Sequence, residues 1–323
     1  MTATTASPQP AAPRSDRSDE VRKALRTVDT GRRRKDRAMQ VVVYVAFALA
    51  VIPLISVAWT VLSNGIERFD WYFLTHSMRG VFGGMDAGGI YHAIVGTFEI
   101  TLGATIISVP IGILTAIYLV EYGRGSLARS VTFFVDVMTG IPSIVAGLFA
   151  YALFAVFFGP GISMGIMGSI ALSVLMIPVV VRSTEEMLKL VPNELREASY
   201  ALGVPKWLTI VKVVLRTATA GIVTGVMLAV ARVIGETAPL LITVGVIDSI
   251  NFNLFDGRMM TLPVYVYRQY SQGYVPCNDA SAVCIPEINF DRAWAAALTL
   301  ILIVMVLNIL ARLVSRYFSP KIR

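Results

Sequence analysis

The hydrophobic residues of this chain occur in long uninterrupted runs, without the alternating or one-sided patterns of soluble proteins. Several runs exceed the roughly 18 residues that a helix needs to cross a bilayer. A helix that is apolar on every side has no face for water, so these runs predict an all-α polytopic membrane protein. We place six transmembrane spans, at about 38–63, 93–120, 131–158, 164–182, 217–247 and 291–315.

Composition supports a single membrane domain preceded by a polar tail. Of the 323 residues, 55% are hydrophobic and 15% are charged. Residues 1–37 are rich in Ala, Pro, Ser, Thr and charge, with too little apolar surface to form a core, which predicts a disordered tail. The tail is too long and too polar for a signal peptide. The membrane domain is therefore expected to occupy residues 38–323.

The distribution of basic residues predicts the orientation of the spans. The net charge is +7, and 22 of the 28 lysines and arginines lie in the tail, the 121–130 loop, the 182–216 stretch and the C-terminus. Basic residues accumulate on the cytoplasmic side of membrane proteins. Both termini are then cytoplasmic in a cell membrane, and the basic excess indicates topology and contact with lipid, with no nucleic-acid partner.

The two cysteines, Cys277 and Cys284, fall in one predicted external loop, "CNDASAVC". An oxidising compartment permits a local disulfide, and the sequence alone leaves open whether the two are bridged or free. With only His76 and His92 available as further ligands, a metal site is not expected.

The cytoplasmic stretch 182–216 contains a short helix outside the membrane. Pro192 and Asn193 are typical of a helix start, and Gly203 followed by Pro205 is typical of a stop, so we expect this helix at about 193–205. Its charged residues alternate with apolar ones, so one face is suited to docking on a partner protein or on lipid headgroups.

The run "EASYALGVPKWLTIVKVVL" resembles the EAA loop of ABC importer permeases. Glu197, Ala198 and Gly203 match the pattern, whereas Ser199 and Arg216 depart from it, and Arg216 puts the start of the fifth span in doubt. Together with "IPSIVAGLFAY", "LMIPVVVRSTEEML", "ARVIGETAPLL" and "MTLPVYVY", the loop makes the chain similar to PstA-type permeases of phosphate-specific ABC importers over roughly residues 40 to 318.

That resemblance implies a type I importer fold and a non-catalytic subunit of an ATP-driven phosphate importer. It implies that the chain forms half of the pathway with a PstC-type sister permease, while a PstB-type ATPase dimer grips the EAA helix. A PstS-type binding protein then delivers inorganic phosphate from outside. The chain has no G-x-x-x-x-G-K-[ST] loop, so ATP and Mg are expected on the partner ATPase and no cofactor on this chain.

The fifth span carries two charges. On a helix of about 100° per residue, the following residues lie within roughly 60° of one another: Gly221, Gly225, Arg232, Glu236 and Pro239. The G-x-x-x-G pair predicts that this face meets another helix. A charge at mid-membrane costs about 2.5–3.5 kcal/mol. Either Arg232 and Glu236 pair with each other, with Asp136 as a further partner, or they serve transport.

We favour transport, because a guanidinium supplies the donors that replace the water of a phosphate ion. Arg232, about 23 Å into a core of roughly 30 Å, is the first candidate for the pathway. Arg182, at the end of the fourth span, is either a second station or an arginine that reaches the headgroups. Glu236 either holds Arg232 while the pathway is empty or accepts a hydrogen bond from protonated phosphate, which sulfate lacks.

Other functions are possible for an apolar chain with these charges. An importer of another oxyanion, such as sulfate or molybdate, shares the EAA helix but not the Gly-Glu-Thr-Ala-Pro run. A stand-alone secondary transporter or channel is disfavoured by that helix and by the absence of an internal repeat. An intramembrane enzyme would need a nucleophile with a base or metal ligands at depth, and no span contains cysteine.

Overall fold

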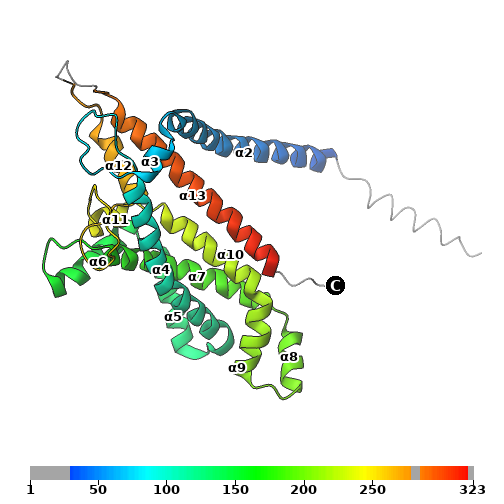
Figure 1. The fold of residues 1–323 in the computed structure, drawn as a ribbon. Helices are drawn as coiled ribbons and strands as arrows, with labels where there is room; N and C mark the ends of the chain where they lie inside the picture. The colour runs from blue at the N-terminus through cyan, green and yellow to red at the C-terminus, as the bar shows by residue number, and fades with distance from the viewer. Residues whose placement is uncertain (1–29, 278–283, 319–323) are drawn as a thin grey trace, which may run out of the picture. The chain divides into compact units, whose positions relative to one another are not determined.

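The computed structural model describes residues 30–277 and 284–318. In these ranges the chain is helical and has no strand. The elements are α2 (Thr30–Gly65), η1 (Ile66–Arg68), α3 (Trp71–Thr75), α4 (Tyr91–Ile117), η2 (Tyr118–Tyr122), α5 (Gly125–Thr139), α6 (Ser143–Phe158), α7 (Gly165–Lys189), α8 (Asn193–Ala201), α9 (Lys206–Thr209), η3 (Ile210–Val214), α10 (Leu215–Ile234), α11 (Ala238–Thr243), α12 (Leu262–Gln272) and α13 (Ile288–Phe318) (Figure 1).

Five of these helical segments in the described ranges are long and apolar enough to cross a membrane. They are Arg33–Arg68, Tyr91–Tyr122, Gly165–Lys189, Lys206–Ile234 and Ile288–Val314. The predicted third span, 131–158, is instead a pair of helices, α5 and α6, that meet at 108°. The pair brings the total to six if it is counted as one span.

The break between α5 and α6 has a local cause. Gly140 ends α5, and Pro142 precedes α6 with an extended ψ of 136°. Proline has no amide hydrogen and disfavours a helical conformation at the residue before it, so the helix stops here and restarts in a new direction. Hydropathy identified the apolar run at 131–158 correctly, but it does not report that the helix changes direction within the run.

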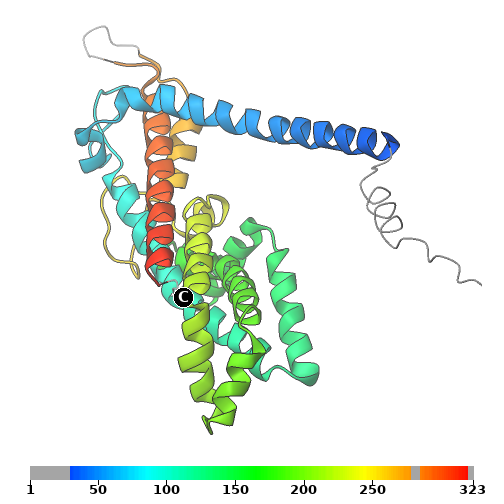
Figure 2. The same ribbon diagram turned by 90° about the vertical axis from the view of Figure 1, so that its right-hand side faces the viewer.

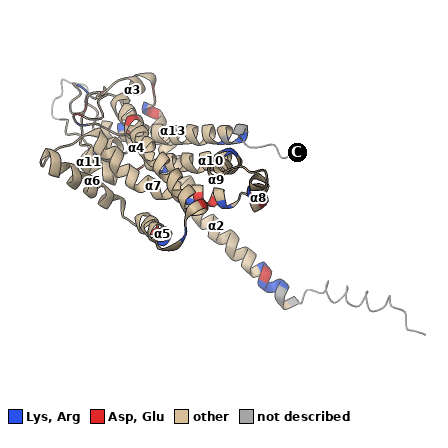
Figure 3. Ribbon diagram, turned by 90° about the horizontal axis from the view of Figure 1, so that it is seen from below, with Lys and Arg blue, Asp and Glu red and all other residues tan. Residues whose placement is uncertain are grey.

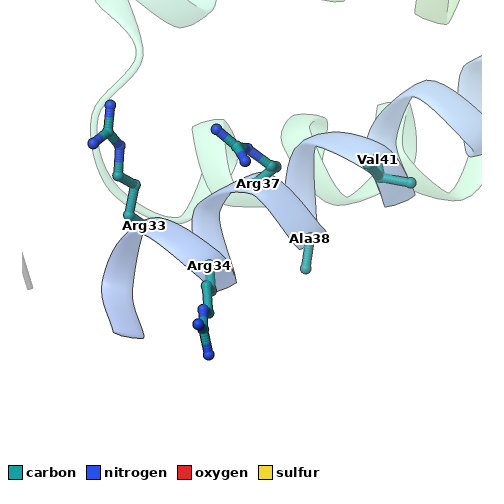
Figure 4. A pocket seen from close by; sticks show the side chains of 5 residues that line it. All are labelled: Arg33, Arg34, Arg37, Ala38 and Val41. Atoms are coloured by element: carbon teal, nitrogen blue, oxygen red, sulfur yellow. The ribbon is translucent and has the colours of Figure 1, made fainter. Parts of the chain in front are cut away.

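The chain divides into two units, residues 1–59 and 60–323, which are described separately. The described part of the first unit is the α2 helix as far as Trp59. The last eight residues of the predicted tail, 30–37, form its first turns, and the remainder of the tail lies outside the described residues. Arg33, Arg34 and Arg37 project from these turns beside Ala38 and Val41, where the basic run gives way to apolar residues (Figure 4).

The second unit is organised around α7, the most buried of its long helices. Small residues hold α7 against α4. Ser169 Oγ donates to the Ile100 carbonyl at 2.9 Å, and a side chain at Gly112 would overlap Val180. Close approach through glycine and serine is typical of membrane helices, which gain packing and hydrogen bonds but no hydrophobic driving force from association.

Figure 1 shows α8 and α9 at the end of the bundle opposite α3 and α12, and Figure 2 shows α10 and α13 running alongside each other between these ends. Two π-helical segments, η2 and η3, lie next to α8 in this arrangement. Charged residues gather mainly towards the ends of the helices (Figure 3). This is the pattern expected when the middle of each helix is in lipid or in the protein core.

Candidate functional site

The predicted fifth span begins earlier and ends earlier than expected. The helix is continuous from Lys206 to Ile234, whereas the sequence pattern placed its start at 217 and its end at 247. Gly235 caps α10, Glu236 and Thr237 lie outside any helix, and α11 restarts with Pro239 in its first turn. A proline without an amide hydrogen is well tolerated in that position. The single helical face that included Glu236 and Pro239 is therefore wrong.

The part of that face on α10 is confirmed up to Gly225. A side chain at Gly221 would collide with Met187, and one at Gly225 would collide with Ser183, both on α7. The G-x-x-x-G pair therefore faces protein as predicted, and it sets how closely α10 and α7 approach.

Arg232 lies in the last turn of α10, and its side chain is exposed on the surface of this chain. Among the described residues it forms no ion pair or hydrogen bond through its side chain, and the predicted alternative of a pair with Glu236 is not formed. A cation at a helix C-terminus gains about 0.3–1 kcal/mol from the helix dipole. Because the helix begins at Lys206 and not at 217, Arg232 lies about 39 Å along it, farther towards its C-terminal end than the sequence pattern predicted.

The break after Arg232 leaves backbone groups outside helical hydrogen bonding. Gly235 is exposed in this chain, and Glu236 and Thr237 are half-buried. Within the hydrocarbon region, irregular backbone is tolerated only where protein covers it or where it lines water. Arg232 and this break therefore form a polar surface of this chain, which protein or water would have to cover at membrane depth.

Arg182, the second pathway candidate, is held by two carboxylates. It pairs with Asp136 on α5, and its Nη1 donates to Glu185 Oε2 at 2.8 Å. Glu185 in turn accepts from Lys189 Nζ at 2.7 Å. Asp136, which the sequence analysis offered as a partner for the charges of the fifth span, pairs with Arg182 instead. Whether Arg182 contacts substrate stays a prediction.

The predicted cytoplasmic helix is present as α8, followed by a tight turn. Glu197 and Ala198 lie on its exposed surface. Gly203 has a φ of +75°, in the left-handed region that favours glycine, and it directs the chain back towards α9. The glycine of the EAA pattern is thus explained by backbone conformation.

Residues that sequence reasoning missed anchor α8 to the bundle. Arg196 Nε donates to Glu121 Oε1 at 3.1 Å, and the same guanidinium donates to the carbonyls of Val191 at 2.6 Å and Leu188 at 2.9 Å. Lys206 Nζ reaches the Glu121 carbonyl at 2.5 Å. No local signal identifies this cluster, since Arg196 and Glu121 are 75 residues apart.

Several large apolar side chains in and after α8 are uncovered in this chain. Leu195, Tyr200 and Trp207 are exposed, and Leu202 is 83% exposed. Several exposed large apolar side chains near one another in sequence are a candidate protein-interaction surface.

The structure settles the cysteine question, because Cys277 and Cys284 form a disulfide with a Cα–Cα distance of 5.8 Å. Within residues 30–277 and 284–318, no group of three or more His, Cys, Asp or Glu residues is arranged to hold a metal ion.

Comparisons with known proteins agree with this geometry. A family described as "Binding-protein-dependent transport system inner membrane component" matches residues 108–323. The chain is 47% identical to the phosphate transport system permease protein PstA of Mycobacterium leprae, over 88% of this chain and 90% of that protein. It is 38% identical to PstA of Yersinia pestis, over 88% of this chain and 90% of that protein. The chain belongs to the PstA family of binding-protein-dependent permeases.

Solved structures show the same fold for this PstA-family chain. A chain of a bacterial alginate ABC transporter aligns with a TM-score of 0.59 and 13% identity, over 88% of this chain and 96% of that one. A chain of the inward-facing MetNI methionine ABC transporter aligns with a TM-score of 0.52 and 20% identity, over 72% and 95%. The chain is thus a multi-pass membrane permease with the ABC importer fold.

Proposed function

We propose that this chain is the permease subunit of an ATP-driven importer of inorganic phosphate and forms half of its translocation pathway. The observation that carries the proposal is the match to PstA phosphate permeases over nearly the full length of both chains. Relatives that carry phosphate in their names favour phosphate over sulfate or molybdate. Membership of a binding-protein-dependent family disfavours a stand-alone transporter or channel.

Arg232 is the residue that we assign to phosphate in the pathway. Within residues 30–277 and 284–318 its side chain has no ion-pair partner, and it lies beside a helix break. Its guanidinium can donate two parallel hydrogen bonds to an oxyanion. Phosphate loses hydration energy on entering a low-dielectric passage, so fixed donors there lower the barrier to its passage. Glu236 lies in the break, four residues after Arg232, and we assign it to the same ion.

Partners follow from the same proposal. A PstC-type sister permease completes the pathway and covers the Arg232 surface, and a PstS-type binding protein delivers phosphate at the α12 end. A PstB-type ATPase dimer, which holds ATP and Mg, docks on the exposed residues of α8 and on Leu202 after it. Both termini are cytoplasmic, because the basic residues gather on the α8 side of the membrane.

The first experiment measures ATP-dependent phosphate uptake into vesicles that contain the reconstituted complex. We expect Arg232→Gln to abolish uptake without loss of assembly. A Glu197/Gly203 double substitution should separate ATP hydrolysis from transport. Normal uptake by Arg232→Gln would refute the pathway assignment, and intact coupling in the double variant would refute the docking assignment.

A second variant separates a transport role of Arg232 from a packing role. Leu228 precedes Arg232 by one turn on the same helix face and is 57% exposed. Leu228→Glu therefore supplies an i, i+4 carboxylate partner. A structural arginine tolerates that partner, whereas a pathway arginine is neutralised, so we expect uptake to fall in Leu228→Glu and to persist in the matched control Leu228→Gln.

Glu236→Gln decides between the two roles of the glutamate. Phosphate uptake measured against a sulfate competitor stays selective if Glu236 only holds Arg232. Selectivity weakens if the carboxylate accepts a hydrogen bond from the protonated oxygen of phosphate, because sulfate carries no proton with which to donate one.

A further inference from the structure

A polar cavity lies at the end of the bundle opposite α8. It encloses about 390 Å³ between α12, the start of α13 and the segments before α4 and α13. Its polar lining consists of Asp248, Arg268, Gln269, Gln272, Asn289 and Arg292. Ligand pockets begin at roughly 300 Å³, so the space suits a small ligand with part of its hydration shell. We call it the Arg292 cavity.

Arg292 is the most unusual residue of this cavity. It is only 2% exposed, and among the described residues it forms no ion pair. The neighbouring Asp291 does not pair with it either. A buried charge is costly unless an opposite charge accompanies it, and a cation near a helix N-terminus is also disfavoured by the helix dipole.

Not all N–H donors of the Arg292 guanidinium have acceptors among the described residues. Nη2 donates to the carbonyls of Met85 at 2.7 Å and Ala87 at 2.9 Å, and Nη1 makes a long contact of 3.4 Å with Asn289 Oδ1. Nε has no partner in the described chain. These contacts account for three of five N–H donors, and all three acceptors are neutral oxygens.

Arg268 adds a second cation to the same lining. Its Nη1 donates to Asp248 at 2.7 Å, and its side chain is 30% exposed, so the remaining donors can reach a ligand. Counting Arg268, Arg292 and Asp248, the lining carries one net positive charge. The amide groups of Gln269, Gln272 and Asn289 supply neutral donors and acceptors. A small oxyanion is the ligand class that satisfies this set.

We propose that the Arg292 cavity receives inorganic phosphate on the external side, before the ion enters the passage at Arg232. The inference rests on the proposed function, because the topology and the substrate come from it. The unpaired, buried Arg292 supplies the charge, Arg268 supplies an adjustable second donor, and Asp248 can accept a hydrogen bond from a protonated phosphate oxygen. The phosphate of a lipid headgroup has the same chemistry and is the rival occupant.

The test uses the complex purified through this chain, in nanodiscs and without the external binding protein. Equilibrium binding of radiolabelled phosphate is compared for wild type, Arg268→Gln and Gln272→Glu. Loss of one charge-assisted hydrogen bond, or addition of a like charge at the rim, should weaken binding about tenfold or more. Arg79→Gln is the matched control, because Arg79 is an exposed arginine outside the cavity lining. It should bind as wild type.

Substitution of Arg292 itself tests folding as much as binding, since Arg292 also holds Met85 and Ala87, so the two rim variants decide the question. Arg232→Gln should keep phosphate bound in the cavity while losing uptake. Unchanged phosphate binding in both rim variants, in a complex that still imports phosphate, overturns the inference and leaves the proposed function intact. A wild-type complex that does not import phosphate overturns the proposed function as well.

A second measurement distinguishes free phosphate from the phosphate of a lipid headgroup. Mass spectrometry of lipids that copurify with wild type and Arg268→Gln shows whether an anionic lipid depends on the cavity. Loss of that lipid in Arg268→Gln, with free phosphate bound equally by both proteins, assigns the cavity to a headgroup and refutes phosphate. Equal lipid content with weaker phosphate binding supports the proposal.

Discussion

The ion pair between Arg196 and Glu121 should determine how firmly α8 is fixed to the membrane bundle. The side chains are 13% and 6% exposed, so the pair is shielded from solvent and little screened. Arg196→Gln leaves the Glu121 carboxylate buried without its guanidinium. Removing one partner of a buried pair costs about 3–5 kcal/mol. The Leu188 and Val191 carbonyls lose their donor in the same variant.

Glu121→Gln is a milder change. The amide oxygen still accepts from Arg196, and the guanidinium keeps its two carbonyl acceptors, so we expect a cost of about 1–3 kcal/mol. The double variant should cost less than the sum of the two single changes by 1 kcal/mol or more, because the buried charges are removed together. A double variant that costs less than the sum of the single variants indicates an ion pair, whereas a simple loss of packing would give additive costs.

Hydrogen exchange reports the local opening of α8. Amides of α8 should exchange roughly 100- to 4,000-fold faster in Arg196→Gln, since each 1.4 kcal/mol corresponds to a factor of ten. The number of ATP molecules hydrolysed per phosphate imported should rise in parallel, because a loosened helix transmits less of the ATPase motion. Arg129→Gln is the control, being an exposed arginine on α5 without an ion pair among the described residues. Wild-type exchange and coupling in Arg196→Gln would refute the anchor.

Three further changes test other parts of the structure. Gly225→Leu should overpack α10 against Ser183, cost about 1–3 kcal/mol and lower the melting temperature, whereas Gly235→Ala, at an exposed position, should have little effect. Leu202→Glu should weaken pull-down of the ATPase by roughly ten- to a hundredfold if this side chain is buried on docking. Cys277→Ser opens a loop with a sequence separation of 7, worth about 2.5 kcal/mol in the chain-entropy description, and should speed proteolysis of the external loop. Dithiothreitol should do the same to wild type and nothing more to Cys277→Ser.

Hydropathy and cap residues predicted most of the helices, because both signals are local. The α8 helix and the turn at Gly203 are present where the pattern placed them. The two errors concern direction. A run of apolar residues looks the same whether its helix is straight, bent at Pro142 or broken after Ile234. Hydropathy reports how favourably a segment enters lipid, and it does not report the direction in which the helix runs.

The parts of the site that the sequence did not predict depend on contacts between distant segments. Glu121 and Arg196 meet only because η2 and α8 lie at the same end of the bundle. The Arg292 cavity likewise combines α12, α13 and the segment before α4. Arg232 could be singled out from sequence because a lone charge in an apolar run is itself the signal. The position of Arg232 relative to Glu236 could not be predicted, because a helical wheel assumes one continuous helix and the helix ends at Ile234.

Several arginines of this permease join distant segments of the chain through ion pairs. Arginines that join segments of the chain have carboxylate partners: Arg68 with Asp86, Arg182 with Asp136 and Glu185, Arg196 with Glu121, and Arg268 with Asp248. Arg232 and Arg292 have none in the described chain, although one lies in a membrane span and the other is buried. A protein that needed these two only for packing would gain by pairing or replacing them. In the two proposals above, each of these arginines would instead meet an anion that comes and goes, at two separate positions along this chain.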